Sequence, residues 1–406
     1  MSIFTVIGLG LLAMVVVLRF KVPIGAAILA GGALMWALWN PSIPSLGSAV
    51  TEMLSQSRTY DLLFALYFVM CLEIELRKSG TLRGMVDSLN EIFSSTKVTL
   101  ATMPAFLGLL PSMGGARFSA PIVDEASRGM EISRESKASI NFWFRHVCEF
   151  MSPIIPGMIL GCAVANISVS DLVVHLAWMA VVAFLAGWFV LIRPLRFTDR
   201  RLKREHPPES RRRHIREISL AIGPVLVNVI LMLVFNVSAG LAMGIVTVLM
   251  IPVLHWMKRP VSVRDIFVGA LDWKLLVNVT CILYFISVLT EAGILDEMIR
   301  AFQSTDLPTP VIIAAVSTVV GILTGMSQGH AAIVMPIVAG IAPGDLNLAG
   351  IVMVFGVAGQ MITPTHVCLM VTVDYFKSDF FKTLAPIVLL EAIILTIFSV
   401  VTYLMW

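Results

Sequence analysis

The sequence predicts an all-α polytopic membrane protein built from two inverted-topology repeats. Three observations lead to this fold class: the composition, two interrupted apolar stretches, and an internal similarity between the halves. Of the 406 residues, 58% are hydrophobic and only 14% are charged, against about 25% charged in an average soluble domain. The uncharged runs of about 16 to 20 residues are long enough to cross a bilayer as helices. Because these runs are continuously apolar rather than alternating, they exclude an outer-membrane barrel.

Ten spans can be placed along the chain, each with no more than a few charges. They cover approximately residues 3–18, 22–39, 61–76, 139–166 and 171–192, then 218–235, 239–257, 275–290, 347–373 and 383–406. The first run carries its charges after the apolar residues, so we expect a retained helix rather than a signal peptide. Two further stretches, about 98–126 and 308–342, contain PSMGGAR and TGMSQGH at their middles. These predict re-entrant hairpins that return to the side they entered.

The placement of basic residues supports this map. With the amino terminus outside, 25 of the 29 Lys and Arg residues fall on the cytoplasmic side, as expected for a multi-pass protein of the inner cell membrane. Arg58 and Arg300 face outward, whereas Arg117 and Arg145 lie at membrane depth. The map places both termini outside, and it holds only if each hairpin leaves the topology unchanged. The net charge of +3 therefore reports orientation and gives no indication of nucleic-acid binding.

A basic cytoplasmic linker, residues 194–217, separates a first repeat (1–193) from a second (218–406). Ordered Gly, Pro and Ser/Thr-Pro matches recur at offsets of 211 to 215 residues between the halves. Examples are Gly108 with Gly321, Pro121 with Pro336, and Ser152-Pro153 with Thr363-Pro364. Five spans per repeat is an odd number, so the second copy is inverted in the membrane. Such repeats are typical of secondary transporters whose site lies at the repeat interface.

The spans at 139–166 and 347–373 are each expected to break at a proline. Pro153 and Pro364 remove a backbone donor and clash with the preceding turn. The interruption frees carbonyl groups that can hold a cation and N–H groups that can hold an anion. The hairpin tips supply close backbone approach and polar side chains. The candidate substrate-binding residues are Ser112, Gly114, Gly115, Arg117, Ser119, Ser152, Pro153, Ser327, Gln328, Gly329, His330, Thr363, Pro364 and Thr365.

Ionisable residues inside the membrane are costly and usually functional. Arg117 offers a bidentate donor fork for a carboxylate, although it could instead pair with Glu149 as a structural bridge. Glu149, Ser152 and Thr363 are the candidates for holding a coupling ion. Arg145 and Glu149 are spaced to share a helix face and pair with each other. Glu149 has Gln360 as its repeat partner, so its charge belongs to one half only.

Other polar residues leave two readings open. His330 and His366 could bind substrate or protons, or could make ordinary interhelical hydrogen bonds. The segments 80–93 and 291–303 mix polar and apolar residues, as interfacial arms or plain loops would. The five cysteines include no CxxC pair, so neither a disulfide framework nor a zinc site is predicted. No cofactor or metal is expected beyond a sodium ion.

The hairpin sequences PSMGGARFSAPIV and TGMSQGHAAIVMPIV, each followed by a broken span, resemble those of the ion transporter superfamily, which includes gluconate permeases and divalent-anion/sodium symporters. The chain is most similar to an uncharacterised family of prokaryotic integral membrane proteins with GGA in the first hairpin. The resemblance covers essentially the whole chain. It implies a scaffold domain, a mobile transport domain, elevator-type alternating access and a homodimer. The Ser-Asn-Thr signature of the divalent-anion symporters is absent, so neither dicarboxylate selectivity nor sodium coupling follows from it.

Together these features predict a non-enzymatic secondary transporter of a small organic anion, a carboxylate, coupled to sodium or protons. A flippase or exporter of a larger anionic or lipid-linked substrate is the main alternative, because its substrate is also anionic. A channel and an intramembrane hydrolase are more remote. The hydrolase would need Ser327 with a histidine, or His146 with Glu149 on a metal, and HExxH does not occur.

Overall fold

The computed structural model describes residues 1–20, 22–92, 95–109, 116–127, 130–196, 208–303 and 307–405. Within these ranges the secondary structure is helical, with no strand. Five helices are long and apolar enough to cross a membrane: Val169–Ile192, Arg211–Phe235, Ala239–Trp256, Trp273–Glu291 and Phe380–Met405. Shorter apolar helices surround them. The chain is therefore a multi-pass helical membrane protein.

The first half contains ten helices, followed by one π-helical turn that extends the last of them. In order they are α1 (Ile3–Arg19), α2 (Ile24–Trp39), α3 (Ile43–Ser55), α4 (Ser57–Lys78), α5 (Thr81–Ile92), α6 (Thr96–Gly108), α7 (Ala116–Ala126), α8 (Arg134–His146), α9 (Pro156–Ala165), α10 (Val169–Gly187) and η1 (Trp188–Ile192). The pairs α6–α7 and α8–α9 occupy the predicted hairpin and broken span.

The second half has the same order of elements. They are α11 (Pro208–Phe235), α12 (Ala239–Trp256), α13 (Val263–Phe267), α14 (Trp273–Glu291), α15 (Ile294–Gln303), α16 (Thr309–Thr324), α17 (Ser327–Ile341), α18 (Leu346–Met361), α19 (Val367–Phe376) and α20 (Phe380–Met405). Because α11 begins at Pro208, residues 208–217 of the predicted linker are helical. The helices α3 and α13 were not predicted.

Helices occupy both segments left open between arms and loops. α5 and α15 each follow a glycine with positive φ, Gly80 at 74° and Gly293 at 69°. These are equivalent positions of the two halves, and glycine adopts this conformation without strain. Each arm contacts the first helix of the opposite half, α5 with α11 and α15 with α1. The sharp turn before each arm therefore lets it pack against that helix.

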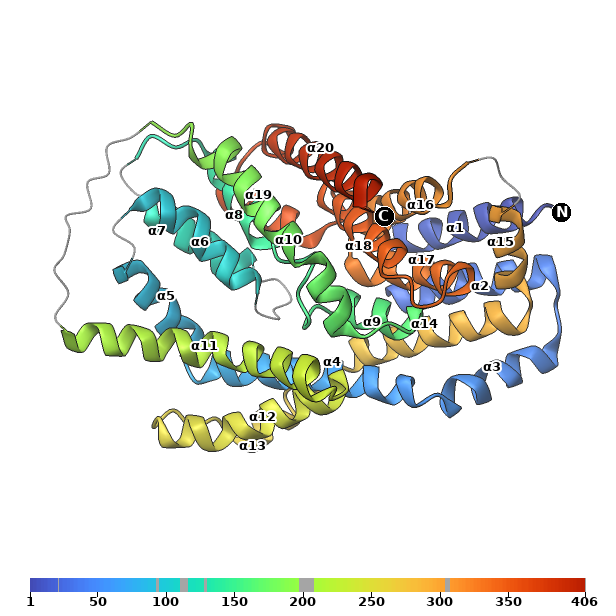
Figure 1. Ribbon diagram of the computed structural model, residues 1–406, viewed down its shortest axis with the longest axis horizontal. Helices are drawn as coiled ribbons and strands as arrows, with labels where there is room; N and C mark the ends of the chain where they lie inside the picture. Colours follow the sequence, from blue (N-terminus) through green and yellow to red (C-terminus); the bar gives the residue numbers. More distant parts are fainter. Residues whose placement is uncertain are drawn as a thin grey trace.

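The helices form two groups. In one, α4 packs on α12 and α2 packs on α14. Each of these pairs joins a helix of the first half to a helix of the second. In the second, each hairpin packs on its own broken span, α6 on α8 and α16 on α18, and each also reaches the other half, through α7 on α19 and α17 on α9. In Figure 1, α6 and α7 lie towards the opposite end of the molecule from the amino terminus and α15.

Glycine permits the tightest helix crossing in each half. A Cβ on Gly108 would lie 1.9 Å from the carbonyl oxygen of Arg145, and one on Gly321 would lie 2.2 Å from that of Gly356. Only a residue without a side chain fits at either crossing. Gly108 and Gly321 are the repeat-matched glycines of the sequence, so their matching reflects the same backbone contact between hairpin and broken helix.

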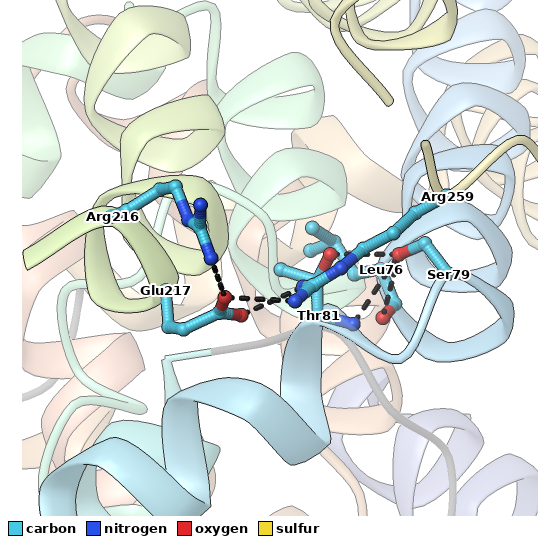
Figure 2. Close-up of polar contacts among 6 residues, drawn as sticks. All are labelled: Leu76, Ser79, Thr81, Arg216, Glu217 and Arg259. Atoms are coloured by element: carbon cyan, nitrogen blue, oxygen red, sulfur yellow. Dashed lines mark hydrogen bonds and ion pairs between the residues drawn. The ribbon is translucent and has the colours of Figure 1, made fainter. Parts of the chain in front are cut away.

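An ion pair joins α11 to the segment after α12. Arg259 donates twice to Glu217, at 2.7 Å to each carboxylate oxygen, and Arg216 lies 3.3 Å from the same group. Figure 2 shows this pair beside the turn between α4 and α5. Glu217 is only 3% exposed, and Gly84 of α5 packs directly against it. The pair thus ties α11, the α12–α13 connection and the arm α5 together.

Candidate functional site

Both broken spans leave the helical conformation at the predicted prolines. α8 ends at His146 and α9 begins at Pro156, while α18 ends at Met361 and α19 begins at Val367. Pro153 and Pro364 lie in the non-helical segments, and Pro156 starts α9 where a missing N–H costs nothing. Each break places the carboxyl end of one half-helix and the amino end of the next inside the molecule.

The two breaks meet through a pair of repeat-equivalent residues. Gln360 Nε2 donates to Glu149 Oε1 at 2.5 Å. This bond joins the first break to the last turn of α18, just before the second break. Arg145 and Glu149 do not share one helix, because α8 ends at His146. Arg145 donates to the Leu107 carbonyl at 3.1 Å, from α8 to the first hairpin.

Two histidines extend this contact. His146 Nε2 lies 3.2 Å from His366 Nε2 and 3.7 Å from a Glu149 oxygen. Each ring also faces a backbone carbonyl through Nδ1: His146 faces Phe142 at 2.6 Å, and His366 faces Gly325 at 2.8 Å. Both side chains are buried. The first break, the second break and the second hairpin are therefore connected by four polar side chains.

The tip of the second hairpin packs against both breaks. Gly325 ends α16 with φ 65°, and a side chain there would collide with Thr365. Thr365 Oγ1 donates to the Ile322 carbonyl at 3.3 Å and shares a hydrogen bond with Thr363. Ser327, at the start of α17, lies directly against Gly157 of the first broken span. The second hairpin thus contacts the first broken span through Ser327 and the second broken span through Gly325.

The remaining predicted site residues fall in three groups. Ser112, Gly114 and Gly115 lie outside the described residues. Arg117 is the second residue of α7, and its side chain also lies outside the described part of the structure. Ser119 and Ser152 are buried, Ser119 on α7 and Ser152 in the first break. Gln328, Gly329 and His330 belong to the first turn of α17, where Gly329 approaches Thr324 and the His330 ring packs on Gly356.

Sequence reasoning missed three residues near the site. Gln360 was named only as a repeat partner, and Cys368, two residues after His366, was dismissed for lack of a CxxC pair. Glu391 lies on α20, which packs against α8 and α18, is 4% exposed, and has no hydrogen-bond partner for either oxygen among the described residues. A carboxylate inside a long helix able to span a membrane was the available signal.

Two polar cavities border the carboxyl end of α9. One, of about 300 Å³, is lined by Asp61, Asn166 and Ser238 among others. The other, of about 260 Å³, is lined by Glu52, Gln56 and Ser287 with α14 and α17 residues. Both lie where α9 meets helices of the α4–α12 and α2–α14 group. Side chains therefore do not fill the boundary between α9 and this group of helices completely.

Broken helices held against the paired helices α6–α7 and α16–α17 define a polytopic helical membrane protein. The chain belongs to the family described as Protein of unknown function (DUF401), whose model matches residues 2–405. No curated protein matches it. Among solved structures it is similar to the YdaH transporter of Alcanivorax borkumensis, described as having an unusual topology. That similarity has a TM-score of 0.58 and 12% identity, and covers 87% of this chain and 86% of the other.

Proposed function

We propose that this protein is a secondary active transporter of a small organic anion, a carboxylate, bound between the two broken spans and the two hairpin tips. The observation that carries the proposal is the convergence of both breaks on one buried polar cluster, through Glu149, Gln360, His146 and His366. Half-helix amino ends point positive partial charge into such a site, which favours a carboxylate. Arg117 supplies the charged contact in this proposal.

The movement we propose is of the elevator type. The helix group α6–α10 with α16–α20 would move as a transport domain against a scaffold of α1–α4 and α11–α14. Support comes from the contact pattern, in which the arms α5 and α15 bridge the two groups, and from the two cavities at the boundary. A duplication is supported by the matching element order of the halves, and an odd number of spans in each half would invert the second copy. A homodimer in the inner membrane, with outside termini, completes the proposal.

Coupling to protons would use Glu149, with Glu391 close enough to sense its charge. Coupling to sodium would instead use the freed carbonyls and the hydroxyls of Ser152 and Thr363. A buried carboxylate without hydrogen bonds is costly in its charged form. This favours protons as the coupling ion, because Glu391 is such a group among the described residues.

Uptake into proteoliposomes tests the proposal. Labelled mono- and dicarboxylates and sugar acids are offered under an imposed sodium or proton gradient, with Arg117→Ala compared with Arg264→Ala. Arg264 is exposed on α13, so Arg264→Ala removes the same positive charge at a position outside both breaks. We expect saturable uptake that is driven by one gradient, lost in Arg117→Ala and retained in Arg264→Ala. Absence of uptake for every carboxylate under both gradients would contradict the substrate class and turn attention to larger anionic or lipid-linked substrates.

A further inference from the structure

The buried cluster at the two breaks has a donor arrangement that its hydrogen bonds do not explain. A carbonyl oxygen accepts but cannot donate. Since Nδ1 of His146 faces the Phe142 carbonyl and Nδ1 of His366 faces that of Gly325, both Nδ1 atoms must carry the proton. In the neutral rings each Nε2 atom then carries a lone pair and no proton. They point at each other across 3.2 Å, where two acceptors repel unless a cation lies between them.

We propose that His146, His366 and Cys368 bind a divalent transition-metal ion of the zinc class. The Nε2, Nε2 and Sγ atoms all lie within 4.8 Å of one another. Zinc bonds of 2.0–2.1 Å to nitrogen in a tetrahedral site require ligand nitrogens about 3.3 Å apart, close to the 3.2 Å observed. A sulfur bound at about 2.3 Å in the same site would lie about 3.6 Å from each nitrogen, within the 4.8 Å that encloses the three ligand atoms here.

The surroundings match those of a metal site. A metal-binding histidine commonly donates its second ring N–H to a backbone carbonyl, which fixes the ring and its tautomer. Both histidines do this here, and one of the carbonyls belongs to the tip of the second hairpin. The Glu149 carboxylate, which accepts from Gln360 at 2.5 Å, lies 3.7 Å from Nε2 of His146 and adds negative charge beside the site. Each histidine is therefore held in place by its own backbone partner.

Charge balance favours a divalent ion over a shared proton. A Cys368 thiolate beside the Glu149 carboxylate would place two negative charges in the cluster, against the single positive charge of Arg145. A divalent cation offsets the thiolate and binds both imidazoles and the sulfur at once, which one shared proton cannot do. Cys368 also lies in the first turn of α19, where the helix dipole stabilises a negatively charged ligand. Thiolate and imidazole together suit zinc-class ions rather than sodium or magnesium.

Metal binding to the purified full-length protein in detergent tests this inference. After chelator treatment, zinc is titrated by calorimetry, and cobalt is added as an optical probe of thiolate coordination. We expect one ion per chain and a thiolate-to-cobalt absorption band. His366→Ala should weaken zinc binding at least 100-fold, since loss of even an outer partner costs about 10- to 100-fold. This readout needs no transport, so it is independent of the proposed substrate.

Matched variants separate ligand loss from misfolding. Cys368→Ser is conservative in size and should abolish the cobalt band while the protein stays monodisperse. Cys162→Ser alters another buried cysteine, on α9, and His255→Ala alters an exposed histidine on α12; both should bind like the parent. The inference is overturned if the parent binds no stoichiometric zinc, if its cobalt complex lacks the thiolate band, or if His366→Ala and Cys368→Ser bind as the parent does.

Discussion

The two broken spans share one architecture but differ in chemistry. The first break covers residues 147–155 and follows Arg145 and His146; the second covers only residues 362–366 and ends at His366. At the central contact the first half contributes the carboxylate of Glu149 and the second contributes the amide of Gln360. The two breaks therefore share an order of elements but differ in the charge that each brings to the contact.

The largest effect we expect concerns a contact that only one half possesses. Arg259→Ala leaves the buried Glu217 carboxylate without its bidentate partner, and breaking such a pair costs about 3 kcal/mol. Thermal unfolding in detergent measures the loss. Lys78→Ala is the control, because its pair with Asp265 is exposed on both sides and is worth at most about 1 kcal/mol. Equal effects of the two variants would show that Glu217 does not depend on Arg259.

The glycine crossings test what the halves have in common. Gly108→Ala and Gly321→Ala each force a Cβ into a backbone carbonyl, and overpacking of this kind costs about 2 kcal/mol. Gly223→Ala on α11 has open space around it and should be neutral or slightly stabilising. Unfolding curves for the three variants make the comparison. A large loss from only one of the two crossings would mean that the halves do not share this packing.

Exchanging Glu149 and Gln360 tests the chemical difference between the two halves. Glu149→Gln should reduce gradient-driven uptake about tenfold, because a hydrogen bond to a charged group is worth about 1.5 kcal/mol. Gln360→Glu added to Glu149→Gln returns the carboxylate from the other half and should recover part of the rate. Uptake is measured in proteoliposomes at saturating substrate. An unchanged rate in Glu149→Gln would remove this residue from the coupling mechanism.

Much of the fold could be predicted because it depends on patterns the sequence displays. Apolar runs, the prolines and the matched Gly108 and Gly321 indicate membrane helices, non-helical segments and a duplication without any knowledge of packing. The ends of elements were less predictable. α11 extends into the basic linker because Arg and Glu are good helix formers, and charge alone gave no indication of this.

The site could be predicted only in outline. The sequence singled out both breaks and the second hairpin, which the structure brings together through Thr365 and His366. The pairing of His146 with His366 joins residues 220 positions apart, and single-sequence spacing carries no signal for such a contact. Cys368 and Glu391 stood in apolar surroundings typical of core residues, so their position near the cluster emerged only from packing.

The most direct test of the account is whether the two halves have opposite orientations in the membrane. The helices α3 and α13 are equivalent elements, and Ser48 and Arg264 are exposed on them. Ser48→Cys and Arg264→Cys are expressed separately in cells and treated with a membrane-impermeant thiol reagent, with the parent chain as background. We predict labelling of Ser48→Cys in intact cells and of Arg264→Cys only after the membrane is opened. Labelling of both from the same side would contradict the inverted repeat, and with it a site formed between two opposed halves.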